Sequence, residues 1–231
     1  GRKDTRVMGV DGIAVYLREY LRQYLTAKKP ERALYPSWNM VKFYNDSINW
    51  ENDPLYGCCN KNTKRNGENY SIYTDGLKVF TTIDSRMQQY AEQAAYQHVA
   101  KYLQPAFNAE NRKKANAPYS SNLTQSQVQQ IINRSIRQSE RYRVLRENNA
   151  SDEEIHRSFR TPIRMSVFTY HGEVDTMMTP IDSIRYYKSF LRTGFISVCP
   201  QNGHVKAYVG GLDYGHFSYD MVMDGRRQVG S

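Results

Sequence analysis

Tryptophan, cysteine and long apolar runs are scarce in this sequence. It has two Trp and three Cys among 231 residues, and no stretch approaches the roughly 18–20 consecutive apolar residues that a membrane-spanning helix needs. We therefore expect no membrane span within these residues. No apolar run of the signal-peptide kind follows the charged start Gly1-Arg2-Lys3-Asp4, so any export signal or membrane anchor is expected to lie outside them.

The few cysteines do not form a metal-binding pattern. Cys58 and Cys59 are adjacent and Cys199 is distant, with no C-x-x-C pair and no histidine at ligand spacing. We expect no metal and no cofactor. Packed small residues or free thiols are the favoured interpretation, and a disulfide between Cys199 and one of the pair stays open.

Signatures of several enzyme classes are absent or incomplete. There is no H-E-x-x-H, no Walker loop and no G-x-G-x-x-G. His171 and Glu173 have the H-x-E spacing of zinc deaminases, but the downstream P-C-x-x-C is missing. Glu173, Asp175 and Asp182 are close in sequence, yet a turn and the first turn of a helix explain them better than an acid/base pair does.

Positive charge is what the chain has in excess. The formal net charge is +9, which suits an anionic partner such as nucleic acid, an acidic membrane face or a cell-wall polymer. Residues 101–160 carry eleven Lys/Arg against six acids, and Tyr142 could stack on a base. A nucleic-acid-binding module is therefore an alternative, although Arg134, Arg137 and Arg141 are spaced as one solvated helical face that needs no ligand.

Residues 1–105 are expected to contain a linker followed by a strand and a helix. Within the linker, 1–69, apolar residues at helical spacing predict a helix from Ile13 that ends near Lys28, and a short helix is expected near 38–50. In the segment 70–105, alternation predicts a strand over 76–83, and Asp84 then caps a helix closed by Pro105. The expected apolar stripe of that helix is Met87, Tyr90, Ala91, Ala94, Ala95, Val99, Tyr102 and Leu103.

Residues 106–231 combine a basic helical insert, 106–160, with a strand-rich segment, 161–231. In the insert, capping boxes at Thr124-x-x-Gln127 and Ser151-x-x-Glu154 open two helices, the first reaching Leu145. After it we expect a strand over 162–170, a helix from Thr179-Pro180, and a hairpin of strands 194–199 and 204–210 with Gly203 at positive φ.

Four segments, in this order, resemble the class A penicillin-binding proteins. Residues 75–84 with 87–92 resemble the opening strand and helix of the transpeptidase domain, and residues 200–211 resemble its P-x-T/N-G-x-V-x-A-x-V-G-G hairpin. Residues 217–220 stand where the family commonly has an F-N-R-A-like run, and residues 227–231 resemble the R-Q-x-G-S that leads into S-x-x-K. Residues 16–21 look like the helix that leaves the glycosyltransferase domain, whereas 106–160 matches no family motif.

The resemblance implies acyl-transfer chemistry at the last residue. In this family the Ser of S-x-x-K attacks the penultimate D-Ala carbonyl of a stem peptide and forms an acyl-enzyme, and the Lys one helical turn later removes its proton. Ser231 matches that serine. The Lys and the later S-x-N and K-T/S-G motifs do not occur in these 231 residues, so this polypeptide alone is expected neither to crosslink peptidoglycan nor to react with penicillin.

The same resemblance implies an α+β fold: the incomplete N-terminal part of a penicillin-binding transpeptidase domain, with a mostly antiparallel sheet and an exposed sheet edge, plus a linker and a helical insert. The parent would act on stem peptides and glycan strands, bind β-lactams, and lie on the periplasmic side of the inner membrane behind an N-terminal anchor. Nucleic acid is not expected as a partner. A non-catalytic role for the insert, docking regulatory envelope proteins, is the further alternative.

Overall fold

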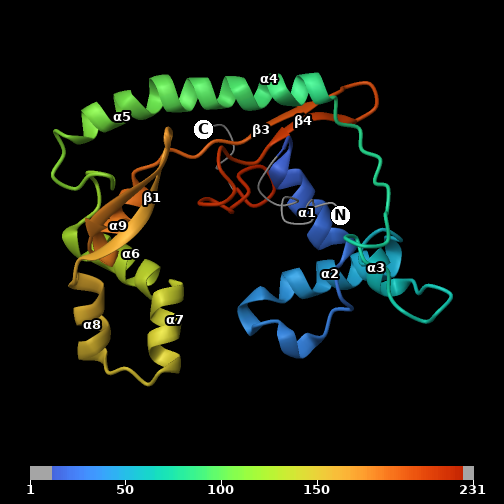
Figure 1. The fold of residues 1–231 in the computed structure, drawn as a ribbon, viewed down its shortest axis with the longest axis horizontal. Coiled ribbons are helices and arrows are strands. Elements are labelled where there is room, and N and C mark those ends of the chain that lie inside the picture. The colour runs from blue at the N-terminus through green and yellow to red at the C-terminus, as the bar shows by residue number, and fades with distance from the viewer. Residues whose placement is uncertain (1–11, 226–231) are drawn as a thin grey trace. The chain divides into compact units, whose positions relative to one another are not determined.

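The computed structural model describes residues 12–225 and divides the chain into two compact units. One unit, called here the terminal unit, combines residues 1–93 with 193–231, and the other, the middle unit, is residues 94–192. Figure 1 shows their elements in chain order. Within the described part of the chain, no helix is both long enough and apolar enough to cross a membrane.

The N-terminal part of the terminal unit is helical, as expected from its periodicity. It comprises α1 (Val15–Leu25), short 3-10 turns η2 (Arg32–Leu34) and η3 (Ser37–Asn39), α2 (Met40–Asn52) and α3 (Cys58–Lys61). The first helix begins after Ala14, which adopts the left-handed conformation at φ 53°. It ends at Leu25, one turn before the expected Lys28, and the short helix expected near 38–50 is confirmed as α2.

The hairpin of the terminal unit is confirmed. Strand β3 (Phe195–Val198) pairs antiparallel with β4 (Val205–Val209), with Ser197 opposite Ala207. Gly203 has φ 72°, and its N–H donates to the Cys199 carbonyl at 2.9 Å to close the turn. A glycine is favoured there because side chains with a Cβ avoid this left-handed region.

The strand expected over 76–83 is wrong. Residues 77–84 form no strand, although they approach β4: the Thr82 hydroxyl donates to the Val205 carbonyl at 2.8 Å, and the Asp84 N–H donates to the Lys206 carbonyl at 3.0 Å. Farther along β4, the backbone groups of Tyr208 are taken by the side chain of Gln88. This edge of β4 therefore offers no continuous row of free backbone donors and acceptors with which a third strand could pair.

The helix after Asp84 is longer than expected. Helix α4 (Ser85–Tyr96) continues through a π-helical stretch, η4 (Gln97–Leu103), into α5 (Gln104–Asn111), so Pro105 does not close the run. Pro105 lies in the first turn of α5, where a missing N–H is tolerated, and the π-helical stretch just before it changes the hydrogen-bond register. Both features explain why the helical run passes a proline.

The middle unit contains the two helices that the capping boxes predicted. They are α6 (Gln125–Arg137) and α8 (Asp152–Arg160), and in both the cap side chain and the third residue bond each other's backbone N–H. The first helix does not reach Leu145: it ends at Arg137, and a separate α7 (Glu140–Glu147) begins because the Ser139 hydroxyl accepts from the Tyr142 N–H at 3.3 Å.

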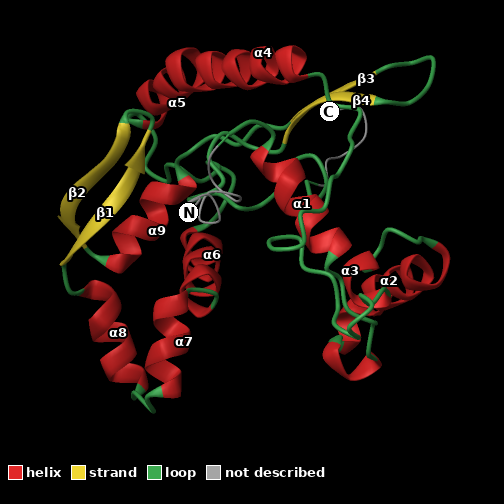
Figure 2. Cartoon of the chain, turned by 45° about the vertical axis from the view of Figure 1, so that its right-hand side comes forward, coloured by secondary structure: helices red, strands yellow, loops and turns green. Residues whose placement is uncertain are grey.

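A second hairpin completes the middle unit. Strand β1 (Ile163–Thr169) confirms the expected strand and pairs with β2 (Gly172–Met178), which had not been expected, before α9 (Pro180–Lys188). Figure 2 shows the two hairpins as separate two-stranded sheets. Helices α6 and α8 contact α9, and the buried apolar side chains of the unit include Val128, Ile132, Ile155, Phe159, Val167 and Phe168. The α+β fold class is confirmed.

Candidate functional site

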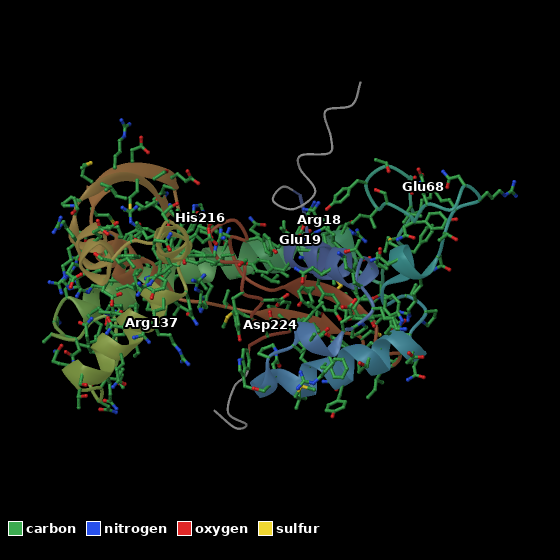
Figure 3. All side chains as sticks on the ribbon, turned by 90° about the horizontal axis from the view of Figure 1, so that it is seen from below. Arg18, Glu19, Glu68, Arg137, His216 and Asp224 are labelled. Carbon is green, nitrogen blue, oxygen red and sulfur yellow. The ribbon has the colours of Figure 1, made fainter. Side chains whose placement is uncertain are left out.

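The segment from Gly210 to Gly225, which leads toward Ser231, is anchored by buried polar groups of the terminal unit. Ser231 itself lies outside the described residues, so the structure does not locate the expected nucleophile. Figure 3 labels Arg18 and Glu19 of α1 with His216 and Asp224 of this segment. We call residues 210–225 the approach segment and describe what holds it.

Gln88 fixes the strand from which the approach segment departs. Its side chain is fully buried, its Nε2 donates to the Tyr208 carbonyl at 2.8 Å, and its Oε1 accepts from the Tyr208 N–H at 2.7 Å. The amide thus makes the two hydrogen bonds that a neighbouring strand would make. This ties α4 to the outer edge of β4.

Glu92 extends this link to the start of α1. It lies one helical turn after Gln88, and its Oε1 accepts from Gln88 Nε2 and from the Ala14 N–H, both at 2.7 Å. The Ala14 N–H precedes the first turn of the helix and would otherwise lack a partner. One carboxylate therefore fixes the entry of α1 relative to α4.

Asp220 holds the turn of the approach segment. Its Oδ2 accepts from the Tyr208 hydroxyl at 2.5 Å, and its Oδ1 accepts from the N–H groups of Val222 at 2.8 Å and Met223 at 3.1 Å. Burial, followed by the hydrogen bond to Asp220, raises the pKa of Tyr208 well above 10.0. The phenol therefore remains a neutral donor to the carboxylate.

Tyr16 and two glycines bring the approach segment against α1. The Tyr16 hydroxyl donates to the Phe217 carbonyl at 2.6 Å, and a Cβ at Gly211 would lie 2.3 Å from the Tyr16 Oη. A Cβ at Gly210 would lie 2.7 Å from Tyr16 Cγ and from an Asp220 oxygen. The Gly-Gly pair therefore permits a backbone approach that no other residue type permits.

Asp213 and His216 form a compact turn within the same segment. The carboxylate Oδ1 lies 2.9 Å from the His216 Nδ1 and accepts from the His216 N–H at 2.8 Å. The pair is an acid and an imidazole in contact, which is one element of a proton-transfer site. Both contacts join residues three positions apart, so the pair orders this turn of the approach segment.

The acidic residues and the arginine that the sequence suggested as site residues of the middle unit have other partners. Glu173 accepts from the Ser166 hydroxyl at 2.9 Å, Asp175 pairs with Arg164 at 2.7 Å, and Asp182 lies in the first turn of α9, so they form no paired acid/base site. Arg141 donates to the Ser158 hydroxyl at 3.0 Å. Within residues 12–225 no cluster of His, Cys, Asp and Glu could hold a metal ion.

The cysteines are free thiols. Cys59 is buried, and burial raises its pKa to about 11, whereas Cys58 and Cys199 are partly exposed. A thiol with so high a pKa is almost entirely protonated at neutral pH and is a weak nucleophile. The interpretation as packed or free thiols is confirmed, and no disulfide joins Cys199 to the pair.

Two open cavities lie on the middle unit. One, of about 710 Å³, is lined by α8 residues and Thr161, and the other, of about 300 Å³, lies where α6, α8 and α9 meet. Arg160 lines both cavities. The residues that line the first cavity are mostly charged, and half of those that line the second are charged, so both cavities suit a polar partner.

The buried polar anchors were not predicted, because an apolar inner face was expected on the helix after Asp84. In the structure Met87, Tyr90 and Tyr102 of the expected stripe are exposed, while Gln88 is fully buried and Val99 is the buried apolar member. The spacing of Gln88 and Glu92 at i and i+4 was the available signal, since such residues share a helical face.

The comparisons with known proteins single out the middle unit. Residues 114–191 match the family model of the penicillin-binding protein middle domain. This match includes most of residues 106–160, to which no family motif had been assigned. Neither the comparison with curated proteins nor the comparison with solved structures returned a match. The matched segment points to a penicillin-binding protein family.

Proposed function

We propose that this chain is part of a class A penicillin-binding protein, a bifunctional peptidoglycan synthase, and that Ser231 is its acyl-enzyme nucleophile. The observation that carries the proposal is the match of residues 114–191 to the penicillin-binding protein middle domain. It is supported by the motif order of the terminal unit, whose hairpin and Gly210-Gly211 pair pack against Tyr16. No metal or cofactor is required for this chemistry.

The approach segment would act by positioning. A serine nucleophile needs a fixed orientation toward its base and its substrate. The hydrogen bonds of Tyr16, Tyr208 and Asp220 fix the backbone of the approach segment as far as Met223. In this proposal the 231 residues serve as linker, frame and interaction region, and catalysis takes place in the longer protein on the periplasmic side of the inner membrane.

Labelling with a fluorescent penicillin tests the nucleophile. In the parent protein, stoichiometric covalent labelling is expected and is lost in Ser231→Ala, while the 231-residue chain alone stays unlabelled. Ser218→Ala is the matched control, because Ser218 is an exposed serine of the approach segment. Labelling that survives Ser231→Ala in the parent would contradict the assignment.

A non-catalytic interaction role is a second candidate for the middle unit. The charged walls of its two cavities and the exposed Arg160 that they share favour it. Because α6 and α8 pack on α9, charge reversal is a cleaner test than deletion. Arg157→Glu with Arg160→Glu should leave penicillin labelling of the parent unchanged and abolish stimulation by envelope partners. Loss of labelling, or stimulation that persists, would contradict this role.

A further inference from the structure

Helix α2 has its apolar face directed at solvent. Trp38, in the turn before it, is 82% exposed, and Val41, Tyr44 and Ile48 are 71%, 60% and 57% exposed. Their spacing of three, three and four residues puts them on one helical face. We call these four residues the α2 stripe. Asp46, a carboxylate, is by contrast only 8% exposed.

The polar inner face of α2 is already filled. The Tyr35 hydroxyl donates to Asp46 Oδ2 at 2.8 Å, the Lys42 Nζ lies 3.0 Å from the same oxygen, and the Tyr35 ring contacts the Phe43 ring at 5.3 Å. The loop before the helix (Figure 1) therefore contacts α2 through Tyr35, on the helical face that carries Asp46 and Phe43. Turning the α2 stripe toward this loop would break the contacts that Asp46 and Phe43 make there.

The sequence before the α2 stripe is basic. Residues 28–48 contain Lys28, Lys29, Arg32 and Lys42 against Glu31 and Asp46, a net charge of +2, and Lys42 is paired with Asp46. Lys28 and Lys29 are exposed. Leu34 and Leu55, 73% and 60% exposed, lie before and after the stripe in sequence.

A membrane surface is the occupant that fits this combination. Helices that lie in a membrane interface carry Trp and aliphatic residues on one face with Lys and Arg beside them, and Trp and Tyr rings favour the headgroup level. The cores of protein interfaces are instead depleted of Lys. We infer that the α2 stripe binds the surface of a membrane that contains anionic lipid, with the basic residues at 28, 29 and 32 contacting the headgroups.

This inference goes beyond the proposed function, because it holds whether or not Ser231 is a nucleophile. It also differs from spanning a membrane: α2 has 13 residues and a length of about 20 Å, and it would lie in the plane of the interface. In such an arrangement α2 would keep the terminal unit against the bilayer.

Trp38 reports directly on the proposed contact. It is one of only two tryptophans, and the other, Trp50, packs against Gly57 and lies under the Lys61 ammonium, 4.9 Å from the ring centroid. Phosphatidylglycerol/phosphatidylcholine vesicles should shift the Trp38 emission to the blue as it leaves water. In Trp38→Phe, which leaves only Trp50, no shift is expected.

Two pairs of substitutions separate the apolar and the electrostatic parts of binding. Val41→Gln with Ile48→Gln, and separately Lys28→Glu with Lys29→Glu, should each weaken co-sedimentation with these vesicles on the order of tenfold. The unchanged chain should bind vesicles of phosphatidylcholine alone as weakly as these variants bind the anionic vesicles. The matched controls are Val174→Gln and the pair Lys101→Glu with Lys113→Glu, exposed positions of the middle unit.

Three outcomes would overturn the inference. The first is a Trp38 emission that is unchanged by anionic vesicles. The second is a blue shift without lipid that grows with protein concentration, which would identify a second copy of the chain as the occupant. The third is an equal loss of binding in the control variants, which would show that net charge or general hydrophobicity, and not the α2 stripe, drives association. Far-ultraviolet circular dichroism of each variant checks that the helices remain.

Discussion

At the scale of single residues, close backbone approaches set the shape of the approach segment. The Gly211 backbone lies so near the Tyr16 ring that an added Cβ would be 2.6 Å from its Cζ and 2.3 Å from its Oη. Tyr16 is 5% exposed, and its hydroxyl is held by the Phe217 carbonyl, so the ring cannot easily yield. A methyl group at this position forces a displacement of the ring or of the strand end.

Gly211→Ala is therefore expected to lower the free energy of unfolding by about 1–3 kcal/mol, the usual cost of overpacking. Gly215→Ala is the matched control, because its nearest neighbour, an Asp213 oxygen, lies at 3.5 Å, an ordinary contact, and the change should be within about 1 kcal/mol of zero. Urea denaturation followed by circular dichroism measures both. Equal effects of the two substitutions would contradict the close approach as the cause.

The pKa of Tyr35 makes the stability of the terminal unit depend on pH in the alkaline range. Burial, followed by the hydrogen bond to Asp46, raises the pKa of Tyr35 from 10.0 to about 12. The unfolded chain then loses this proton at lower pH than the folded chain does, so the stabilisation is complete below pH 10.0 and is lost as pH rises toward about 12. The free energy of unfolding should fall less steeply over this range in Tyr35→Phe than in the unchanged chain. If the free energy of unfolding fell with pH equally in both proteins, the raised pKa of Tyr35 would be contradicted.

The residues that sequence reasoning identified at this scale are those whose role is local. Gly203 follows from the backbone conformation of its own turn, and the caps Thr124 and Ser151 from residues three positions away. For Gln88 the local signal, its i, i+4 spacing to Glu92, shows only a shared helical face, because the backbone that Gln88 bonds, at Tyr208, is 120 residues away. A buried amide in such a contact has the same local sequence context as a solvated one.

At the scale of elements, helix starts and the β3–β4 hairpin were predictable, whereas the absence of a strand over 76–83 and the presence of β2 were not. The capping boxes fixed the first residues of α6 and α8, since both partners of each box lie within one turn. Residues 76–83 have a strand pattern but no strand, because the edge of β4 that they approach is occupied by Gln88. Strand β2 was missed because Gly172–Met178 is mostly exposed and lacks apolar alternation.

Removing a cap should destabilise the middle unit by a predictable amount. Thr124→Ala and Ser151→Ala each delete the hydroxyl that accepts from a first-turn N–H, at a cost of about 1 kcal/mol, and leave the backbone N–H that bonds the third residue of the box. Ser126→Ala, in the first turn of α6 but outside the box, should cost less than about 0.5 kcal/mol. Thermal unfolding of the three variants distinguishes these values. A loss in Ser126→Ala as large as in Thr124→Ala would contradict the capping role.

At the scale of the whole molecule, each unit is closed by one buried glutamine of the same helical run. Gln88 bonds the Tyr208 backbone of the terminal unit. In the middle unit, Gln104 Nε2 donates to the Ser189 carbonyl at 2.9 Å, and its Oε1 accepts from the Leu191 N–H at 2.8 Å. Gln104 thus joins the entry and the exit of a unit that is continuous in sequence from 94 to 192. Each glutamine bonds only the backbone of its own unit, so the two glutamines should stabilise the two units independently.

Substituting either glutamine should therefore loosen one unit and not the other. Gln88→Ala leaves a buried N–H and a buried carbonyl of Tyr208 without their partner, at a cost of about 2–3 kcal/mol, and Gln104→Ala does so at the partly buried groups of Leu191 and Ser189, at a cost of about 1–2 kcal/mol. Hydrogen exchange should accelerate in β4 and α1 for the first variant, and in α9 and α5 for the second. Gln89→Ala, an exposed neighbour of Gln88, should change neither pattern. If Gln104→Ala accelerated exchange equally in both units, the chain would unfold as a single cooperative body, and the middle unit would not be an independent part of it.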